Sequence, residues 1–514
     1  MGESRTKNTV LNLFSSGIRQ FLTLVTTFII RTIFIKNLGA DYLGLNGLFT
    51  NILSLLALSE LGIGTAISFY LYKPIKDGDK NRIKSLMAFY KKCYRMVGIT
   101  IIIIGILITP FLKLMVNLET EVDVNLYIVF LLYIMNTASS YLLFAYKQSF
   151  LLANQQQYKV EKVSSIFCIV QFLFDFISIA ILKNYYIYLI GDIIAILIKN
   201  LMISFVADRD FPFLKEKKIE AISKDEIRVF FHDIFSVSVF RVGSQLFNAT
   251  DNIIISIMLG TTIVGYYSNY YLIISYATLF FGMLMKAFTA GIGNVTVTES
   301  IEKRYEIYKR IDFIMFFVAT IVSVCMCQVF NSFMLLWVGK NDQNYILGQA
   351  IIFVLAFDFY INCSCQTPNA FRETSGNFKS GQWLQLFGGV FNIVLSFVLG
   401  YIWGLFGIFL ATIVSKLLIT VTPFIYKIAR SVFKKNPMLL IIDYYKKLIL
   451  RTVIVAATWF ICLKIHMTSF LGIVLEILIC VVFSLAIISL FYFRSDEYRF
   501  LLRKIKVLLT EKRV

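Results

Sequence analysis

Fourteen strongly apolar stretches run almost end to end through this 514-residue chain, and nearly all of its lysines and arginines fall into alternate gaps between them. The hydrocarbon core of a bilayer is about 30 Å thick, and a helix needs roughly 20 apolar residues to cross it. Hydrophobic residues make up 58% of the chain, and only six prolines interrupt them. The pattern therefore predicts an all-α integral membrane protein with about fourteen transmembrane helices. The predicted spans are approximately 10–35, 44–72, 96–116, 125–152, 162–182, 186–207, 230–259, 264–297, 311–337, 345–371, 380–400, 405–427, 448–466 and 470–493.

The basic residues predict the orientation of these spans. With a cytoplasmic amino terminus, the cytoplasmic gaps hold 39 of the 50 Lys and Arg, including Lys447 and Arg451 beside the thirteenth span. The opposite gaps hold four, which are Lys36, Lys183, Lys340 and Lys464. Because cytoplasmic loops carry the excess of Lys and Arg, we expect a multi-pass protein of the bacterial cell membrane with both termini in the cytoplasm.

Several other classes of protein are excluded by the same residues. The net charge of +19 comes from cations beside membrane ends, where anionic lipid headgroups account for them, so no nucleic-acid partner is predicted. The first span is interrupted by Arg19 and Arg31 and has no small-residue cleavage site after it, unlike a signal peptide. No Walker loop is present, which argues against direct ATP hydrolysis.

The eight cysteines and two histidines do not predict a metal site. Nearly all the cysteines lie inside apolar spans, and the pairs 325/327 and 363/365 have i, i+2 spacing. On a helix such residues point about 200° apart, so neither pair can chelate from one face. We therefore expect no metal and no cofactor other than a coupling ion.

An internal repeat divides the chain. The segment LGADYLG from Leu38 matches LGTTIVG from Leu259 at an offset of 221, and QQQYK ending at Lys159 matches SGNFK ending at Lys379 at an offset of 220. A repeat separated by six helices keeps its orientation in the membrane, so the halves are related by a pseudo-twofold axis along the membrane normal. We predict a six-helix lobe at 1–207, a cytoplasmic linker at 208–229, a second six-helix lobe at 230–430, and an appended two-helix hairpin with a basic tail at 431–514.

These features, together with the run SELGIGTAISFYLYKPI from Ser59 to Ile75, resemble the polysaccharide-exporter branch of the MOP (MATE-like) transporter superfamily over roughly residues 8–430. That superfamily includes multidrug exporters, lipid II flippases and Wzx-type flippases of lipid-linked oligosaccharides. Wzx-type members usually have twelve helices and lipid II flippases fourteen, so the two extra spans leave the subfamily open. The resemblance implies that the first helix of each half lines a central cleft.

Charges within the spans give the candidate substrate site. Arg19 and Arg241 fall within one residue of equivalent positions in the first helix of each half. Intramembrane charges face protein, water or a ligand, and a guanidinium fork suits phosphate oxygens. The candidate substrate-binding residues are Arg19, Arg31, Glu60, Arg241 and Lys286. The alternative is internal pairing with acidic residues inside the spans, which are Glu60, Asp175, Asp192, Asp251, Asp358 and Glu476. Lys199 and Lys416, in the last helix of each half, are expected to contact headgroups or structural partners.

A candidate cation site combines Asp251 on the seventh span, Asn392 and Ser396 on the eleventh, and Thr412 on the twelfth. Asn392 and Ser396 are i and i+4 and share a helix face, and oxygen ligands suit a hard cation such as sodium. The set resembles the sodium site of some lipid II flippases, with Ser396 where those have a second carboxylate. Ordinary polar packing between helices is the alternative. The coupling ion is predicted to be sodium or a proton.

The function predicted from these observations is that of a flippase for an undecaprenyl-pyrophosphate-linked oligosaccharide. It would work by alternating access in cell-surface polysaccharide biosynthesis, beside glycosyltransferases and a polysaccharide polymerase. The alternatives are a flippase for lipid II or a teichoic-acid precursor, a cation-coupled multidrug exporter, and a membrane polysaccharide polymerase. The short outward gaps and the scarcity of histidine argue against an enzyme.

Overall fold

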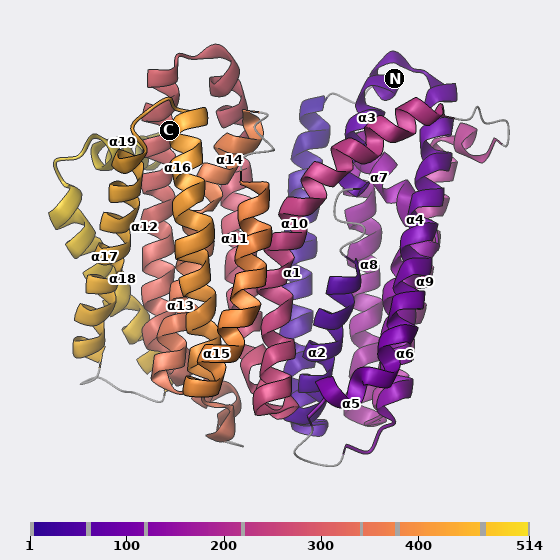
Figure 1. The fold of residues 1–514 in the computed structure, drawn as a ribbon, viewed down its shortest axis with the longest axis horizontal. Coiled ribbons are helices and arrows are strands. Elements are labelled where there is room, and N and C mark those ends of the chain that lie inside the picture. Colours follow the sequence, from indigo (N-terminus) through magenta and orange to yellow (C-terminus); the bar gives the residue numbers. More distant parts are fainter. Residues whose placement is uncertain are drawn as a thin grey trace. The chain divides into compact units, whose positions relative to one another are not determined.

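The structure is a computed structural model that describes residues 5–57, 63–117, 122–216, 222–339, 343–375, 381–462 and 469–511. Throughout these ranges the regular secondary structure is helical (Figure 1). Contacts between residues divide the chain into two compact units, residues 1–265 and residues 266–514.

Unit 1 is built from long helices that pack mainly in pairs. Helix α1 packs on α8, α4 on α6, α2 on α10, and α9 on both α6 and α8. The helices are α1 (Arg5–Asn37), α2 (Ala40–Leu56), α3 (Ile63–Asp77), α4 (Lys80–Ile108), α5 (Leu112–Met115), α6 (Leu126–Leu142), α7 (Ala145–Ala153), α8 (Gln157–Phe176), α9 (Tyr185–Asp210) and α10 (Lys224–Leu259). A π-helical turn, η3 (Ile177–Ile181), follows α8, and a 3₁₀ turn, η4 (Pro212–Lys215), follows α9.

Three apolar clusters lie in the described part of unit 1, of which the smallest joins Leu151 and Val160 to Ile203 and Ala207. The other two are larger. One joins α1, α2, α6 and α9 around the buried rings of Phe49 and Phe130, whose centroids are 5.1 Å apart. The other surrounds Tyr90 and Phe150 of α4 and α7, and Phe211 packs edge-on against Phe150 at 5.0 Å. Between apolar helices such rings contribute mainly through close van der Waals packing.

The described part of the predicted linker, 208–229, is ordered structure. It contains the end of α9, the turn η4 and the start of α10. Lys84 of α4 pairs with Glu216 at 2.7 Å, and Arg82 pairs with Glu226 of α10 at 2.6 Å. A capping box between Ser223 and Glu226 begins α10. Helix α10, which the sequence assigned to the second lobe, packs in unit 1; the lobe boundaries stay a prediction.

The two copies of the LG-x4-G repeat meet in unit 1. A Cβ atom on Gly44 would lie 2.0 Å from the carbonyl oxygen of Thr261, and one on Gly265 would lie 2.1 Å from that of Ala40. Asp41 and Thr262, which are equivalent positions in the two copies, hydrogen-bond through Thr262 Oγ1 and Asp41 Oδ1 at 2.5 Å. Each copy therefore packs its last glycine against the backbone of the other.

Unit 2 is organised around α12, whose apolar stretch is the most buried of the candidate membrane spans. Helices α13, α14, α17, α18 and α19 all contact α12, and α15 packs on α13. The helices from unit 2 are α11 (Thr261–Thr298, whose first turn lies in unit 1), α12 (Ile301–Met334), α13 (Gln349–Ser364), α14 (Gln366–Thr374), α15 (Gln382–Ser415), α16 (Thr422–Ser431), α17 (Pro437–Cys462), α18 (Phe470–Tyr492) and α19 (Asp496–Glu511). The π-helical segments η5 (Leu335–Gly339) and η7 (Lys416–Val421) extend α12 and α15, and the 3₁₀ turn η6 (Gln343–Tyr345) precedes α13.

The predicted C-terminal hairpin packs closely on unit 2 through polar contacts to α12. Gln328 donates to Thr458 of α17 at 3.1 Å, and Ser332 donates to Glu476 of α18 at 3.4 Å. Asp312 accepts from Lys447 of α17 at 2.5 Å. Polar pairs between apolar helices fix their register, because an unpaired partner would be left in hydrocarbon.

Several predicted spans are interrupted in the structure. The span 44–72 corresponds to α2 and α3, with residues 58–62 outside the described part. The span 125–152 is divided into α6 and α7 at Phe144, which has a left-handed φ of 58°. In α15, Gly404 has non-helical backbone angles, and a Cβ on Gly407 would lie 1.9 Å from the oxygen of Leu399. The chain therefore folds back at Gly404, as expected for two predicted spans, 380–400 and 405–427.

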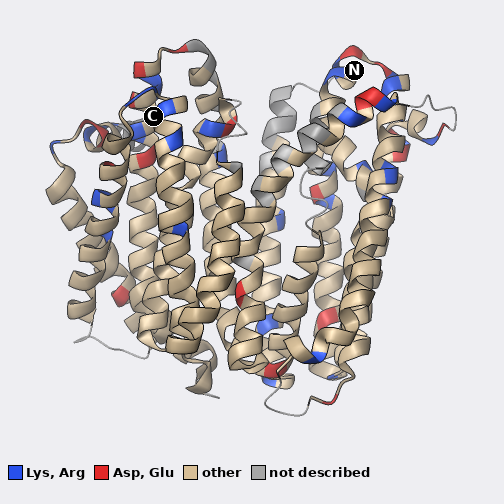
Figure 2. Cartoon of the chain, in the orientation of Figure 1, with Lys and Arg blue, Asp and Glu red and all other residues tan. Residues whose placement is uncertain are grey.

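The number of membrane spans differs from the prediction. Among the described residues, eight helices are long and apolar enough to cross a bilayer, or nine if the bent pair α6 and α7 is one span. One of the eight, Trp383–Ser431, contains the fold at Gly404. The total of fourteen is therefore not confirmed. Figure 2 shows that Lys and Arg gather mainly near one end of the helices in each unit, which agrees with the charge pattern of a multi-pass membrane protein.

Candidate functional site

A cavity of about 320 Å³, lined by both polar and apolar side chains, lies in unit 1 between α1, α2, α8 and α9. It shares Asn46 and Tyr188 with a second cavity of about 470 Å³ between α2, α6, α9 and α10. The first cavity is lined by Thr23, Thr26, Thr27, Ile30, Arg31, Phe34, Leu43, Asn46, Cys168, Gln171, Phe172, Asp175 and Tyr188. The second is lined by Asn46, Thr50, Leu53, Ser54, Ala57, Tyr133, Asn136, Thr137, Tyr141, Tyr188, Asp192 and Gln245.

Helix α1 contributes one face to the first cavity, because its lining residues recur at helical spacing from Thr23 to Phe34. The hydroxyl of Thr26 donates to the carbonyl of Leu22 at 2.8 Å, so it is satisfied within its own helix. Its oxygen also lies 3.4 Å from the sulfur of Cys168 on α8. This seam between α1 and α8 holds Arg31 at the wall of the cavity.

One carboxylate, Asp175, lines the same cavity as Arg31, and a second, Asp192, lines the neighbouring cavity. Asp175 of α8 is 7% exposed, and its Oδ1 has no hydrogen-bond partner among the described residues. Asp192 of α9 accepts a hydrogen bond from Gln171 Nε2 at 2.6 Å. Tyr188 borders both cavities and so lies between the two acids. An arginine and a carboxylate that line one cavity between apolar helices are groups that can bind ions or anionic ligands.

The local backbone explains how these groups come together. Gly191 precedes Asp192, and a Cβ there would lie 1.9 Å from the ring of Phe174 on α8. Glycine therefore lets α9 approach α8 closely at this level. The π-helical turn η3 begins two residues after Asp175, and single π-helical turns occur frequently at functional sites.

From the sequence, Asp175 and Asp192 were noted only as acidic residues inside predicted spans, as possible partners for internal pairing, and neither was given a functional role. Gln171 and Tyr188 were not predicted as site residues. A usable signal was present, because the two acids are almost equally far from the short turn at Lys183–Asn184 between α8 and α9. Residues equally far from a helical hairpin turn lie at similar depth, so the pair could have been placed side by side.

Arg19 forms an ion pair inside the protein, as the alternative interpretation of the in-span charges expected. Its Nε lies 2.6 Å from Glu161 of α8, and its side chain is 40% exposed. Glu161 also accepts from Gln157 at 2.7 Å. The guanidinium is thus paired but still reachable, and its role in substrate binding stays a prediction.

The other predicted substrate residues are not brought to this cavity by the described structure. Glu60 lies outside the described residues, and only the backbone of Arg241, in α10, is described. Lys286 of α11 belongs to unit 2 and is exposed.

The predicted cation site is divided between the two units. Asp251 of α10 is 7% exposed in unit 1, whereas Asn392, Ser396 and Thr412 are buried in unit 2. Ser396 donates to Asn392 Oδ1 at 3.5 Å, and Asn392 Nδ2 has no partner among the described residues. Thr412 donates to the Ile408 carbonyl at 3.4 Å. The structure joins Asn392 to Ser396; the four-residue site stays a prediction.

No cluster of three His, Cys, Asp or Glu side chains suited to a metal ion occurs in the part of the chain that the structure describes.

Two cations assigned to cytoplasmic gaps are in fact buried. Lys447 is 6% exposed and pairs with Asp312 and Asp443, while Arg451 is 2% exposed in the middle of α17. Helix α17 begins at Pro437, eleven residues before the predicted span, so Lys447 lies within the helix. Lys416 likewise pairs with Asp358 at 2.5 Å, which supports the structural role expected for it.

No protein-family model matches the chain, and no curated protein matches it by sequence. Solved structures do match. The lipid II flippase MurJ in an inward closed conformation superposes with a TM-score of 0.65 at 16% identity, covering 94% of this chain and 99% of that one. A multidrug resistance MATE family transporter of the MOP superfamily in an inward-facing conformation gives 0.59 at 14% identity, covering 84% and 98%.

A MOP superfamily transporter from Pyrococcus furiosus, described as having a binding pocket of reverse polarity, gives a TM-score of 0.57 at 16% identity, covering 84% and 98%. At such identities the likeness establishes the fold. The chain therefore has the all-helical fold of the MOP-superfamily transporters, shared by lipid II flippases and MATE exporters.

Proposed function

We propose that this protein is a flippase that moves a polyprenyl-pyrophosphate-linked saccharide from the cytoplasmic to the outer leaflet for cell-surface polysaccharide biosynthesis. The observation that carries this proposal is the extent of the structural likeness. The lipid II flippase covers 94% of the chain and the MATE transporter 84%. The difference, about 51 residues, equals in size the helices α17 and α18 that a twelve-helix exporter would lack.

The chemistry of the unit 1 cavity supports an anionic headgroup. Arg31 borders the cavity from α1, and guanidinium forks bind phosphate oxygens with two parallel hydrogen bonds. Asp175 lines the same cavity. Protonation of Asp175 would remove a negative charge from the cavity and so favour the pyrophosphate at Arg31, which would link substrate binding to proton movement. Arg19 and Arg241 remain further candidates for the pyrophosphate on the cleft walls.

The coupling ion has two candidate sites. A proton at Asp175 or Asp192 is the first, since both acids border cavities. Sodium at Asp251, Asn392, Ser396 and Thr412 is the second. Either ion would act by binding one facing state more tightly than the other, because only differential affinity shifts a conformational equilibrium.

Three other functions remain as alternatives. A lipid II or teichoic-acid precursor flippase uses the same headgroup chemistry, and the saccharide alone would distinguish it. A cation-coupled multidrug exporter is favoured by the acidic pair in unit 1, because carboxylates attract cationic drugs. A membrane polysaccharide polymerase is the enzyme alternative. As a flippase, the protein would work with a polysaccharide polymerase and glycosyltransferases as partners.

The test is a flipping assay with the purified protein in liposomes that carry a fluorescent polyprenyl-pyrophosphate saccharide. We expect Arg31→Ala to reduce the flipping rate by about tenfold or more, since a lost charge-assisted hydrogen bond to phosphate costs roughly 1.5–3 kcal/mol. Arg31→Lys should restore the rate only in part, because lysine lacks the planar fork.

The coupling ion is tested in the same assay. Replacing sodium by choline at fixed pH, and then changing pH, distinguishes the two coupling sites.

The matched control is Arg209→Ala, because Arg209 is 65% exposed and, among the described residues, pairs only with its neighbour Asp210. Flipping at the wild-type rate by Arg31→Ala would contradict the role of Arg31. Absence of flipping by the wild-type protein for every polyprenyl-linked saccharide, with efflux of a cationic dye instead, would replace the proposal by the exporter.

A further inference from the structure

A further pocket, with a mostly polar lining, opens at the opposite end of the unit 1 helices from the basic residues of α4. It has a volume of about 610 Å³, within the range of small-molecule sites. Its lining comes from the start of α2, the segment before α6 and the turn between α8 and α9: Tyr42, Val122, Asp123, Val124, Asn125, Lys183, Asn184, Tyr185 and Tyr186. The charge pattern predicts that this end faces outward.

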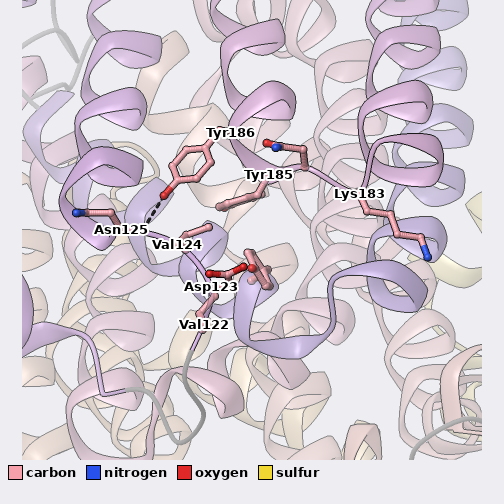
Figure 3. A pocket seen from close by; sticks show the side chains of 9 residues that line it. Val122, Asp123, Val124, Asn125, Lys183, Tyr185 and Tyr186 are labelled. Atoms are coloured by element: carbon pink, nitrogen blue, oxygen red, sulfur yellow. Dashed lines mark hydrogen bonds between the residues drawn. The ribbon is translucent and has the colours of Figure 1, made fainter.

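The pocket combines aromatic faces with planar polar groups. Tyr186 accepts a hydrogen bond from the backbone amide of Asn125 at 2.6 Å, which holds its ring at the rim. Figure 3 shows Asp123 among the tyrosines, and Lys183 stands apart from them on the other side. Asp123 and Lys183 are both exposed.

The hydroxyl of Tyr42 keeps its proton and can therefore donate a hydrogen bond. Burial, the nearby carboxylate of Asp123 and Tyr186 together raise the pKa of Tyr42. Tyr42 therefore offers both an apolar ring face and an O–H group, and Asp123 offers two acceptor oxygens beside it.

A layer of aromatic rings joins this pocket to the Arg31 cavity. Tyr185 packs edge-on against Tyr42 at 5.1 Å and stacks on Tyr188 at 6.0 Å. Phe34, which lines the Arg31 cavity, contacts Tyr185 at 5.9 Å. The Tyr185 hydroxyl is 3.0 Å from that of Tyr133, which lines the second cavity. One aromatic layer thus has a polar site on each side.

We propose that this pocket binds the saccharide part of the transported lipid on the outward side, which deepens the proposed function and rests on it. A sugar ring has an apolar C–H face that packs on a tyrosine ring, and its hydroxyls pair with carboxylate and amide groups. A lipid tail finds no such surface here, because the lining is mostly polar. The aromatic layer separates this subsite from the cavity that holds the pyrophosphate.

The test measures equilibrium binding of lipid-free saccharide to the purified full chain in nanodiscs. The probe is the saccharide released by mild acid from the lipid-linked pool of the producing cells, and chitobiose is the defined comparison. We expect Asp123→Ala and Tyr42→Leu each to weaken binding of the released saccharide by about tenfold. Asp123 is exposed, so its substitution leaves folding intact even if Tyr42→Leu does not.

The matched control is Tyr127→Leu, an exposed tyrosine beside the pocket that does not line it; its affinity should equal that of the wild type. No binding by the wild type, or equal binding by Asp123→Ala, overturns the subsite. Flipping is measured on the same preparations. Flipping without saccharide binding removes the subsite and keeps the proposed function, whereas binding without flipping removes the proposed function and keeps the subsite.

Discussion

At the scale of single residues, Arg451 shows how the chain tolerates a charge deep among apolar helices. Its guanidinium donates from Nε to Ser323 Oγ at 3.1 Å and lies 5.1 Å from the ring of Phe357 and 5.9 Å from that of Tyr360. No carboxylate pairs with it among the described residues. The cation is therefore held by one hydroxyl, the sulfur of Cys327 and two aromatic faces.

This arrangement predicts non-additive stability effects. Ser323→Ala should destabilise the protein by about 1–3 kcal/mol, because it leaves part of a buried guanidinium unsatisfied. Arg451→Met should be close to neutral, since replacing a buried charge by an apolar side chain often is. In the double variant the cost of Ser323→Ala should largely disappear. Thermal unfolding of the four proteins checks this, and additive effects would contradict it.

At the scale of elements, the two LG-x4-G turns of the sequence repeat pack closely against each other in unit 1. The last glycine of each copy lies against a carbonyl of the other, and Asp41 bonds Thr262. Under the proposed alternating access, we expect this contact to form in one facing state and to break in the other. Glycine is required here because any Cβ would displace the opposing backbone.

We therefore expect Gly44→Ala to separate the turns and to abolish flipping in the liposome assay. In a background without native cysteines, Asp41→Cys and Thr262→Cys should crosslink through a short bifunctional thiol reagent, and Gly44→Ala should prevent the crosslink. Gly17→Ala is the control, because a Cβ there meets no atom within 4 Å. An intact crosslink in Gly44→Ala would show that the turns absorb the methyl group.

At the scale of the whole molecule, the charge bias still predicts both termini in the cytoplasm. Ion pairs such as Lys147–Asp208 and Lys159–Asp210, both 2.6 Å, lie at the predicted cytoplasmic ends of α7, α8 and α9. The opposite end of unit 1 carries the pocket of Tyr42 and Asp123, for which we propose saccharide binding. A transporter of a lipid-linked sugar needs this polarity, with the substrate entering on one side and leaving on the other.

The topology is tested by labelling single cysteines in intact cells with a membrane-impermeant reagent. Asp123→Cys should react from outside, whereas Glu216→Cys should react only after the membrane is permeabilised. Both positions are exposed in the structure, so accessibility within the protein does not decide the result. The reverse pattern would falsify the orientation and place the saccharide pocket on the cytoplasmic side.

The sequence alone determined the class, a helical membrane protein, and much of the architecture. Hydropathy decides which segments partition into a bilayer, and the basic residues decide which side the loops occupy. Long helices, the LG-x4-G repeat and the candidate Arg31 follow from the residues themselves. Only the tertiary structure decided the partners. It paired Arg19 with Glu161, placed Asp175 and Asp192 at the cavities of unit 1, and buried Lys447 and Arg451 against α12. Those contacts join residues far apart in the chain, and helical periodicity fixes which face a side chain is on but not which helix that face meets.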